Sequence, residues 1–379
     1  MGAIRQTTFP EWFRHLGVIP FLLILPFQYL PKIHPGDTQP WVLIVGILCY
    51  FLWNFNFKIS VGGASFAILA PLIVLVLLLD TREGVFFREL YFLVSLFVFW
   101  ELATRDRGEI LHIGLKWTLS LYLIIALIQT ASVKLGFHFP ISGRFLASRG
   151  GVPSLACEPA MLATIGALIT MYLLDRGDSI AWAIMGIILI LLSGSLSGMA
   201  FMVFPLMHKR LRKGLWLIVP AVVILLVVSS LTEGLSLTNR LGHLLDRGLS
   251  VNTLLSDVST NMRTGHVVYQ IQNLWQNLFF GENRPFYQVY KEFANESNHF
   301  IDTGSFAILS FGGEMFFYLG WIGLLLILLV LFFSGIGRKN VGIIHYGFLV
   351  SLLMNPVSFA LPYFVIYLVG IKKDWACAE

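Results

Sequence analysis

Residues 158–207 read EPAMLATIGALITMYLLDRGDSIAWAIMGIILILLSGSLSGMAFMVFPLM. Three apolar runs, at 158–174, 179–193 and 195–207, are separated by two short turns, and charged side chains occur only at the first residue and in the first turn. A helix that crosses a membrane needs about 20 mainly apolar residues. Closely spaced runs of this kind therefore predict helices that cross a membrane and return.

The apolar composition extends through nearly the whole chain. Of its 379 residues, 57% are hydrophobic and 12% are charged, and the mean hydropathy is +0.78. Soluble domains carry about 25% charged residues, so one membrane anchor cannot explain the deficit. No small-residue cleavage site follows the first apolar stretch, and no cleaved signal peptide is expected. We expect an all-α polytopic membrane protein, one integral domain over 1–379, with about twelve helices at 16–31, 40–57, 61–79, 89–104, 112–133, 158–174, 179–193, 195–207, 215–231, 314–334, 341–354 and 357–371.

Lys and Arg are distributed unevenly between the two sides that these helices define. With the N-terminus inside, the cytoplasmic segments hold fifteen of them, and the short outer loops hold six. Cytoplasmic loops are enriched in positive charge, so both termini are predicted to be cytoplasmic. The segment 232–304 is left out of the count, because long loops cross membranes regardless of charge. It is predicted to form a helical subdomain on the outer side.

Several classes of function lack the residues that they need. Cys49, Cys157 and Cys377 are predicted to lie at different depths, so no disulfide framework is expected, and no Cys/His pair has zinc spacing. The outer loops contain no paired aspartates for a divalent ion and no Gly-rich phosphate loop with lysine. We therefore predict no metal and no cofactor, which disfavours hydrolases and metal-dependent transferases. The net charge of +5 reflects the predicted topology, so no nucleic-acid partner is predicted.

Basic side chains recur with helical spacing in the outer segment 232–304. Two amphipathic helices each carry a stripe at i, i+3 and i+7: Arg240, His243 and Arg247 in the first, and Arg263, His266 and Gln270 in the second. The second helix is predicted to begin at Thr260 or Asn261, to run to about Phe279 and to end at Gly281. Such arginines can pair with lipid phosphates at the membrane surface. Because two neighbouring helices share the pattern, binding of a lipid-linked anion by guanidinium forks is favoured.

The outer loop 134–158 ends in a carboxylate that follows two arginines. Glu158 and Pro159 begin a predicted helix, and Arg144 and Arg149 precede them. A carboxylate at this position stabilises a helix N-terminus through the macrodipole, and proline is tolerated in the first turn. A carboxylate at the membrane interface is also placed to act as a base or to bind a sugar hydroxyl. Both roles remain open for Glu158.

Other polar positions are weaker candidates. His299 follows Asn298 at the end of the long outer segment, and a lone histidine is more often structural than catalytic. His345 lies within a predicted helix and is interpreted as a packing residue, while Glu314 is a secondary candidate near the outer end of its helix. The small-residue turn at 193–198 predicts close packing of two helices.

Three stretches of the chain together resemble a known family. They are GRFLASRGGVPSLACEPAMLATIG, then LLSGSLSGMAF, and then STNMRTGHVVYQIQNLWQNLFFGENRPFY with SNHF before YLGWIGLLL. In this order they resemble segments of the bacterial O-antigen polymerases (Wzy) and the related O-antigen ligases, which are membrane glycosyltransferases of one superfamily. The likeness covers about residues 140–334 in pattern and the whole chain in topology.

The sequence departs from the family pattern at three places. Ala160 follows the Glu-Pro pair where serine is usual, which keeps the carboxylate but removes a hydroxyl. The Asn-His pair at 298–299 reverses the common order, which bears on the role of the histidine. Leu196 stands where many relatives carry a basic residue, and this removes one candidate cation.

The resemblance implies a GT-C-like fold and a reaction at the periplasmic face of the bacterial inner membrane. The growing glycan would leave undecaprenyl diphosphate and join the non-reducing end of a second lipid-linked repeat unit, without a metal and with inversion. Arg263 is expected to stabilise the developing diphosphate charge, and Glu158, or else His299, to act as the base. Expected partners are undecaprenyl-diphosphate-linked oligosaccharide, membrane lipid and a chain-length regulator protein. The expected substrate-binding residues are Arg144, Arg149, Arg240, His243, Arg247, His266 and Asn298.

Three other functions remain open. A ligase would share the fold and the donor and would move the glycan to lipid A core, although the Glu-Pro element favours a polymerase. A transporter of lipid-linked saccharide would need buried charges near the middle of the bilayer, where the predicted helices are almost entirely apolar. A non-catalytic scaffold for polysaccharide assembly would tolerate the loss of Arg263 and Glu158.

Overall fold

The structure is a computed structural model that describes residues 43–44, 46–48, 94–95, 97–98, 101, 109–135, 151–156, 158–195, 198, 201–209, 211, 258–273, 281–282, 284, 286–297, 299–301, 311–323, 325, 328, 342–354 and 366. Within these residues the chain is helical and contains no strand, which confirms the all-α prediction. Several of the predicted helices lie wholly or largely outside them.

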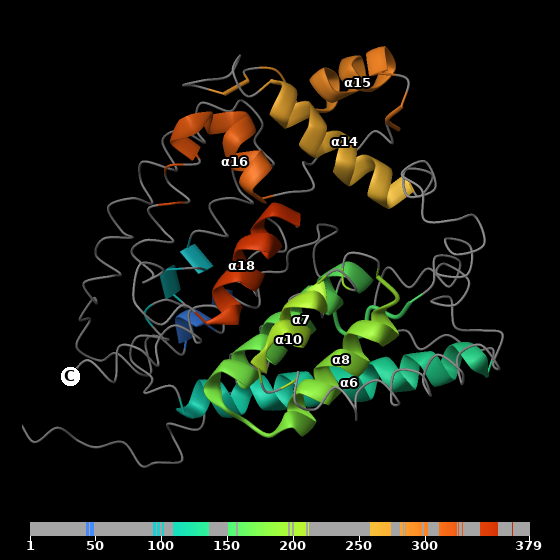
Figure 1. Ribbon diagram of the computed structural model, residues 1–379, viewed down its shortest axis with the longest axis vertical. Helices are drawn as coiled ribbons and strands as arrows, with labels where there is room; N and C mark the ends of the chain where they lie inside the picture. The colour runs from blue at the N-terminus through green and yellow to red at the C-terminus, as the bar shows by residue number, and fades with distance from the viewer. Residues whose placement is uncertain are drawn as a thin grey trace, which may run out of the picture.

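One group of helices forms a bundle. It consists of α6 (Glu109–Lys134), α7 (Pro159–Arg176), α8 (Ile180–Ser193), α10 (Val203–Met207) and α18 (Ile343–Met354). Helix α7 lies at the centre and contacts the other four (Figure 1). The predicted helices at 112–133, 158–174, 179–193 and 341–354 therefore form, with ends shifted by a few residues.

Helix α7 is central because its sequence is apolar on every side. Residues 161–174 are all buried, as expected for a helix without a polar face. Small side chains allow its neighbours to come close. A Cβ at Gly186 of α8 would overlap the Thr170 side chain, and a Cβ at Gly198 would overlap Ala163. The small-residue turn before α10 thus packs against α7, as its composition predicted.

The outer surface of the bundle carries large apolar side chains. Among the described residues, one helix, at His112–Ser132, is long and apolar enough to cross a membrane, and Ile180–Ser193 and Ile343–Leu352 are shorter apolar helices. One face of α6 exposes a row of them along its length: Ile113, Trp117, Ile124, Leu127 and Ile128.

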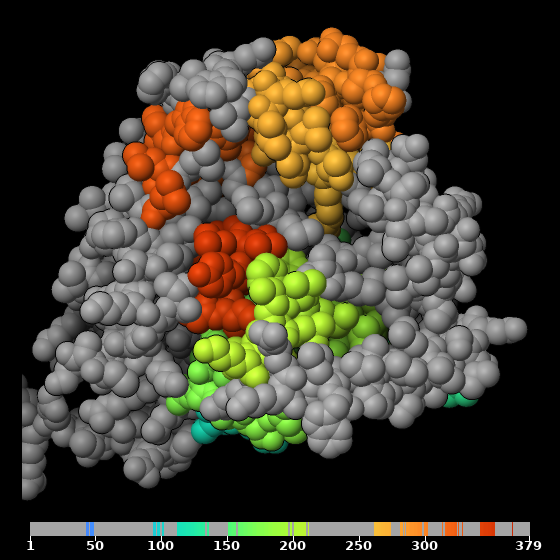
Figure 2. Space-filling model, viewed as in Figure 1, coloured from blue at the N-terminus to red at the C-terminus, as the bar shows by residue number. Residues whose placement is uncertain are grey.

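A second group of helices lies at one end of the bundle. It consists of α14 (Val258–Gln272), α15 (Phe286–Ser297) and α16 (Phe311–Leu319). Figures 1 and 2 show α14 and α15 together at one extremity of the molecule. The core of this group is largely aromatic: Tyr269, Phe286, Val289, Tyr290, Ala294 and Phe317.

Two predicted helices in this part of the chain have different ends in the structure. The helix predicted at 314–334 begins at Phe311 and is interrupted at Gly320, which has a left-handed backbone (φ 58). The second outer helix, predicted to reach Phe279, ends at Gln272. There both the backbone and the side-chain amide of Asn273 donate to the Tyr269 carbonyl, at 3.0 and 2.8 Å, and a side chain that bonds to the backbone in this way competes with helix continuation.

Candidate functional site

Glu158 occupies the N-cap position of α7 without capping it. Its backbone is extended (φ −150, ψ 158), and its side chain makes no capping hydrogen bond. The Glu158 carbonyl accepts the first hydrogen bond of the helix, from Leu162 N at 3.1 Å. Pro159 has no backbone N–H, so one amide that would otherwise need a partner is absent. The Glu158 side chain therefore does not cap α7 through a hydrogen bond.

The carboxylate of Glu158 faces Arg263. Glu158 Oε1 lies 3.9 Å from Arg263 Nη2, and the two side chains are 28% and 19% exposed. This separation is too long for a hydrogen bond, so the contact is an ion pair. Two residues chosen from distant parts of the sequence, one as a base and one as a diphosphate-binding cation, thus lie side by side.

The loop that leads to Glu158 is packed into the bundle. The segment 134–158 was expected to be an external loop, but its described part at 151–156 is largely buried. Val152 N donates to Leu192 O of α8 at 3.2 Å. Gly151 (φ +96) approaches Ser193 so closely that a Cβ would overlap its carbonyl. Glycine is therefore required here, both for its backbone conformation and for its size.

Arg263 lies on the same side of α14 as His266, which packs against α15. We expected His266 to share an exposed basic stripe with Arg263, but His266 is 1% exposed. Its ring packs edge-on against Phe286 and Tyr290 of α15, with centroids 4.8 and 4.4 Å apart. Burial, and then the positive charge of Arg263, lowers the pKa of His266 from 6.5 to about 3.

His266 is accordingly neutral at physiological pH and acts in the aromatic core. This corrects the expectation that the stripe is exposed, because spacing alone does not say which helix face points inward. Gln270, the third member of the stripe, also faces the protein: a Cβ at Gly313 of α16 would overlap the Gln270 amide. The same stripe that was predicted to bind substrate therefore joins α14 to α15 and α16.

His299 is tied to α14 through its backbone. The Asn261 amide donates to His299 O at 3.0 Å, and Ile301 N donates to Asn261 Oδ1 at 2.9 Å. The His299 side chain is exposed. In the described part of the chain, no hydrogen bond or ion pair joins its imidazole to Glu158 or Arg263. Of the two predicted bases, Glu158 is the one that lies beside the arginine.

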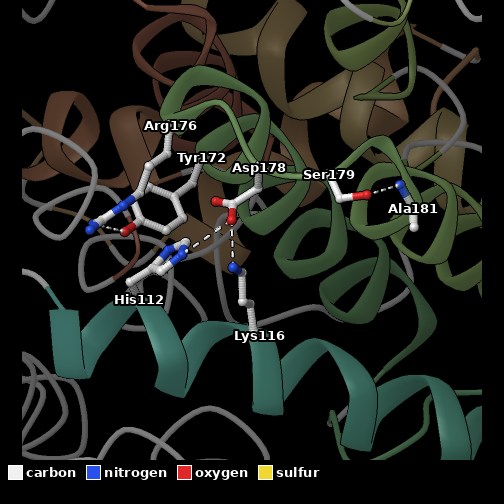
Figure 3. Close-up of polar contacts among 7 residues, drawn as sticks. All are labelled: His112, Lys116, Tyr172, Arg176, Asp178, Ser179 and Ala181. Carbon is white, nitrogen blue, oxygen red and sulfur yellow. Dashed lines mark hydrogen bonds and ion pairs between the residues drawn. The ribbon is translucent and has the colours of Figure 1, made fainter.

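The polar side chains at the opposite end of α7 form a second cluster (Figure 3). Asp178 Oδ1, just beyond α7, lies 3.3 Å from His112 Nε2 and pairs with Lys116 Nζ, both on α6. Nearby, Arg176 Nη1 donates to the Tyr172 hydroxyl at 2.9 Å. None of these residues was predicted to belong to a site. In the sequence, only the position of these charged residues close to the ends of apolar runs indicates that they could interact.

A carboxylate at the same end of α7 also fixes α18. Asp175 Oδ2 accepts from Ile344 N in the first turn of α18 at 3.1 Å, and Asp175 Oδ1 lies 3.6 Å from His208 Nε2. A carboxylate at a helix N-terminus is stabilised by unpaired amides and by the macrodipole. A Cβ at Gly342 would overlap this carboxylate. Helix α7 thus has a carboxylate–guanidinium contact at one end and two structural carboxylates at the other.

The remaining predicted site residues are not placed by the structure. They lie outside the described residues and stay predictions: Arg144, Arg149, Arg240, His243, Arg247 and Asn298. Comparison of the chain with protein families, curated proteins and solved structures finds no match.

Proposed function

We propose that this chain is a polytopic membrane glycosyltransferase that uses glycans linked to undecaprenyl diphosphate as donors, and that it is a polymerase of lipid-linked repeat units. The observation that carries the proposal is the contact between Glu158 and Arg263, 3.9 Å apart. A base for the acceptor hydroxyl and a cation for the leaving diphosphate must lie close enough together to contact the same bound substrates. These two side chains meet that requirement.

The proposed membrane location is supported by the shape and polarity of the bundle. The segment His112–Ser132 of α6 has 21 residues, which is ~31 Å at 1.5 Å per residue, close to the ~30 Å hydrocarbon core of a bilayer. Helix α7, with 18 residues, packs against it. The charged side chains of α7 are confined to its two ends, and the neighbouring α6 exposes a row of large apolar side chains. We assign the Asp178 end to the cytoplasm and the Glu158 end to the periplasm, as the positive-inside pattern predicts. We place the protein in the bacterial inner membrane with both termini inside.

In the proposed reaction, a sugar hydroxyl of the acceptor repeat unit attacks the anomeric carbon of the donor glycan. The bond between this carbon and the phosphate oxygen breaks, and its electron pair leaves with the diphosphate carrier. The hydroxyl proton passes to the Glu158 carboxylate. Arg263 stabilises the charge that develops on the diphosphate, which a fixed cation can do without a metal. A single displacement of this kind inverts the anomeric configuration.

The ion pair explains how both groups are kept in place before substrate binds. A diphosphate carries more negative charge than one carboxylate and accepts both prongs of a guanidinium, so it competes well for Arg263. Transfer of Arg263 from Glu158 to the diphosphate leaves the carboxylate available to accept a proton. His299, whose backbone carbonyl is bound by Asn261 of α14, is the second candidate for the base.

The test is to incubate the purified protein in detergent with undecaprenyl-diphosphate repeat units alone and to separate the products on a gel. The proposal predicts a ladder of lipid-linked glycans of increasing length. Product that forms only after lipid A core is added would identify a ligase with the same donor. A folded protein that makes no product under either condition would contradict the transferase assignment and favour a transporter or scaffold.

A further inference from the structure

Gln129 in α6 is paired with the loop that ends at Glu158. Ser154 N donates to Gln129 Oε1 at 2.7 Å, and Gln129 Nε2 donates to Ser154 O at 3.0 Å. Gln129 is 1% exposed and Ser154 is 0% exposed. A carboxamide offers one donor and one acceptor side by side, so Gln129 binds Ser154 as a neighbouring peptide group would.

Ser154 adopts a backbone conformation that its side chain does not favour. Its φ is +53, and it is the only non-glycine residue with positive φ among the described residues. Its hydroxyl donates to Tyr122 O of α6 at 2.7 Å, so its N–H, its carbonyl and its side chain are all bound to α6. Strained residues persist where the surroundings determine them strongly, and they gather at functional sites.

Ser154 lies in a tight turn, four residues before Glu158 in the sequence. Ala156 N donates to Pro153 O at 2.9 Å, which closes a turn around Ser154, and Leu155 and Ala156 are buried. Glu158, two residues after Ala156 in the sequence, is the N-cap residue of α7. Because the Glu158 side chain does not cap the helix, the helix end alone does not hold the carboxylate in place.

We propose that Gln129 is a positioning residue that sets the placement of Glu158 relative to Arg263. This inference rests on the proposed transferase function for its effect on the reaction, but the placement itself can be measured without any reaction. Gln129 acts through the backbone of Ser154 and does not contact substrate. A misplacement of about 1 Å at a reacting group can cost about 10²-fold in rate, so the loss of the Gln129 pairing should lower kcat and leave KM little changed.

The control is the residue next to Gln129 on the same helix. The Thr130 hydroxyl donates to Ala126 O at 2.8 Å within α6, so Thr130→Val also removes one side-chain hydrogen bond but does not touch the loop. Gln129→Leu removes both bonds to Ser154. Gln129→Glu provides a rescue: a protonated carboxyl can accept from Ser154 N and donate to Ser154 O, whereas a carboxylate cannot donate.

The measurement is the distance between spin labels at Ala160 in α7 and Thr264 in α14, in the full chain with the three native cysteines replaced. We expect one narrow distance distribution in the parent and in Thr130→Val, and a shifted or broadened one in Gln129→Leu, together with about a 10²-fold lower kcat. In folded Gln129→Glu, the narrow distribution should return as the pH is lowered.

An unchanged distance in Gln129→Leu would overturn the inference, whatever the activity. So would a Gln129→Glu protein that folds but shows no recovery at low pH. A distance that depends on Gln129 in a parent protein without transferase activity would support the positioning role and would contradict the proposed function alone.

Discussion

The carboxylate of Glu158, at the start of α7, lies 3.9 Å from the guanidinium of Arg263, in α14, so this contact joins the helix bundle to the group formed by α14, α15 and α16. Each partner is fixed by its own group of helices: Glu158 by the buried loop before α7, and Arg263 by the aromatic core behind α14. The contact therefore reports the relative position of the two groups. Any shift between them alters the candidate site directly.

Replacement of Arg263 tests the diphosphate-binding role. Arg263→Ala should lower the rate of product formation by about 10²–10³-fold, the range for one lost charge-stabilising donor, while expression and membrane insertion stay normal. Arg263→Lys should restore little, because an ammonium group cannot replace a bidentate guanidinium fork. The rate is measured from ladder formation with lipid-linked repeat units. Full activity in both variants would show that the assignment is wrong.

Replacement of Glu158 separates catalysis from helix capping. Glu158→Gln should lower the rate by about 10²–10⁴-fold, as for a lost general base, with only a small decrease in the thermal midpoint, since no capping bond is lost and a partly exposed ion pair contributes little. Ser179 is the matched control, because its hydroxyl does cap α8 by accepting from Ala181 N at 3.4 Å. Ser179→Ala should cost ~0.5 kcal/mol of stability and keep full activity. The opposite pattern would make Glu158 a structural residue.

The buried His266 predicts acid sensitivity of the α14–α15 pair. Its pKa is lowered from 6.5 to about 3 in the folded state, so the unfolded state binds a proton first as the pH falls. The free energy of unfolding is therefore not reduced by this group above pH 6.5. Below pH 6.5 it falls by up to ~1.4 kcal/mol per pH unit. His266→Phe keeps an aromatic ring in place and should remove this loss between pH 7 and pH 5.

Hydrogen exchange of the α14 and α15 amides measures the effect, since it reports local opening. The parent should lose protection on going from pH 7 to pH 5, after correction for intrinsic exchange rates, and His266→Phe should lose less. Equal losses in the two proteins would show that His266 is not the group responsible. His266→Phe should also keep transferase activity, because a residue of the aromatic core binds no substrate.

Alanine substitutions at Gly151 and Gly177 separate the effect of backbone strain alone from the effect of displacing the loop before Glu158. Both have left-handed backbones, with φ +96 and +89, so alanine at either position should cost about 1 kcal/mol. Only at Gly151 would the new Cβ also overlap a backbone carbonyl, that of Ser193. Gly151→Ala should therefore displace the loop before Glu158 and reduce activity, whereas Gly177→Ala, in an exposed turn at the far end of α7, should not. Equal activities would contradict the importance of this loop.

The bundle helices were predictable because their sequences leave little choice. Uniformly apolar runs between short turns define α7 and α8, and small residues at Gly186 and Gly198 allow close packing. The sequence of α15 also carries a helical pattern, because its apolar residues repeat at the spacing of one helix face: Phe286, Val289, Tyr290 and Phe293. That face is the one that the structure buries.

The direction in which a face points was not predictable from spacing. Arg263 and His266 share a face of α14, but only the aromatic rings of α15 make that face an inward one. The nearness of Glu158 to Arg263, and the pairing of Gln129 with Ser154, each join segments that are distant in sequence. Such contacts depend on how helices pack, and a single sequence carries no local signal for them.

The most direct test of the central claim is a double-mutant cycle on the rate of glycan transfer, with the parent, Glu158→Gln, Arg263→Ala and the double variant assayed on the same lipid-linked substrate. Residues that act as one catalytic unit are strongly non-additive. The parent should produce the ladder, and the double variant should be no slower than the worse single variant by more than a few-fold. A double variant whose loss equals the product of the two single losses would show that the residues act independently, and would contradict a shared site.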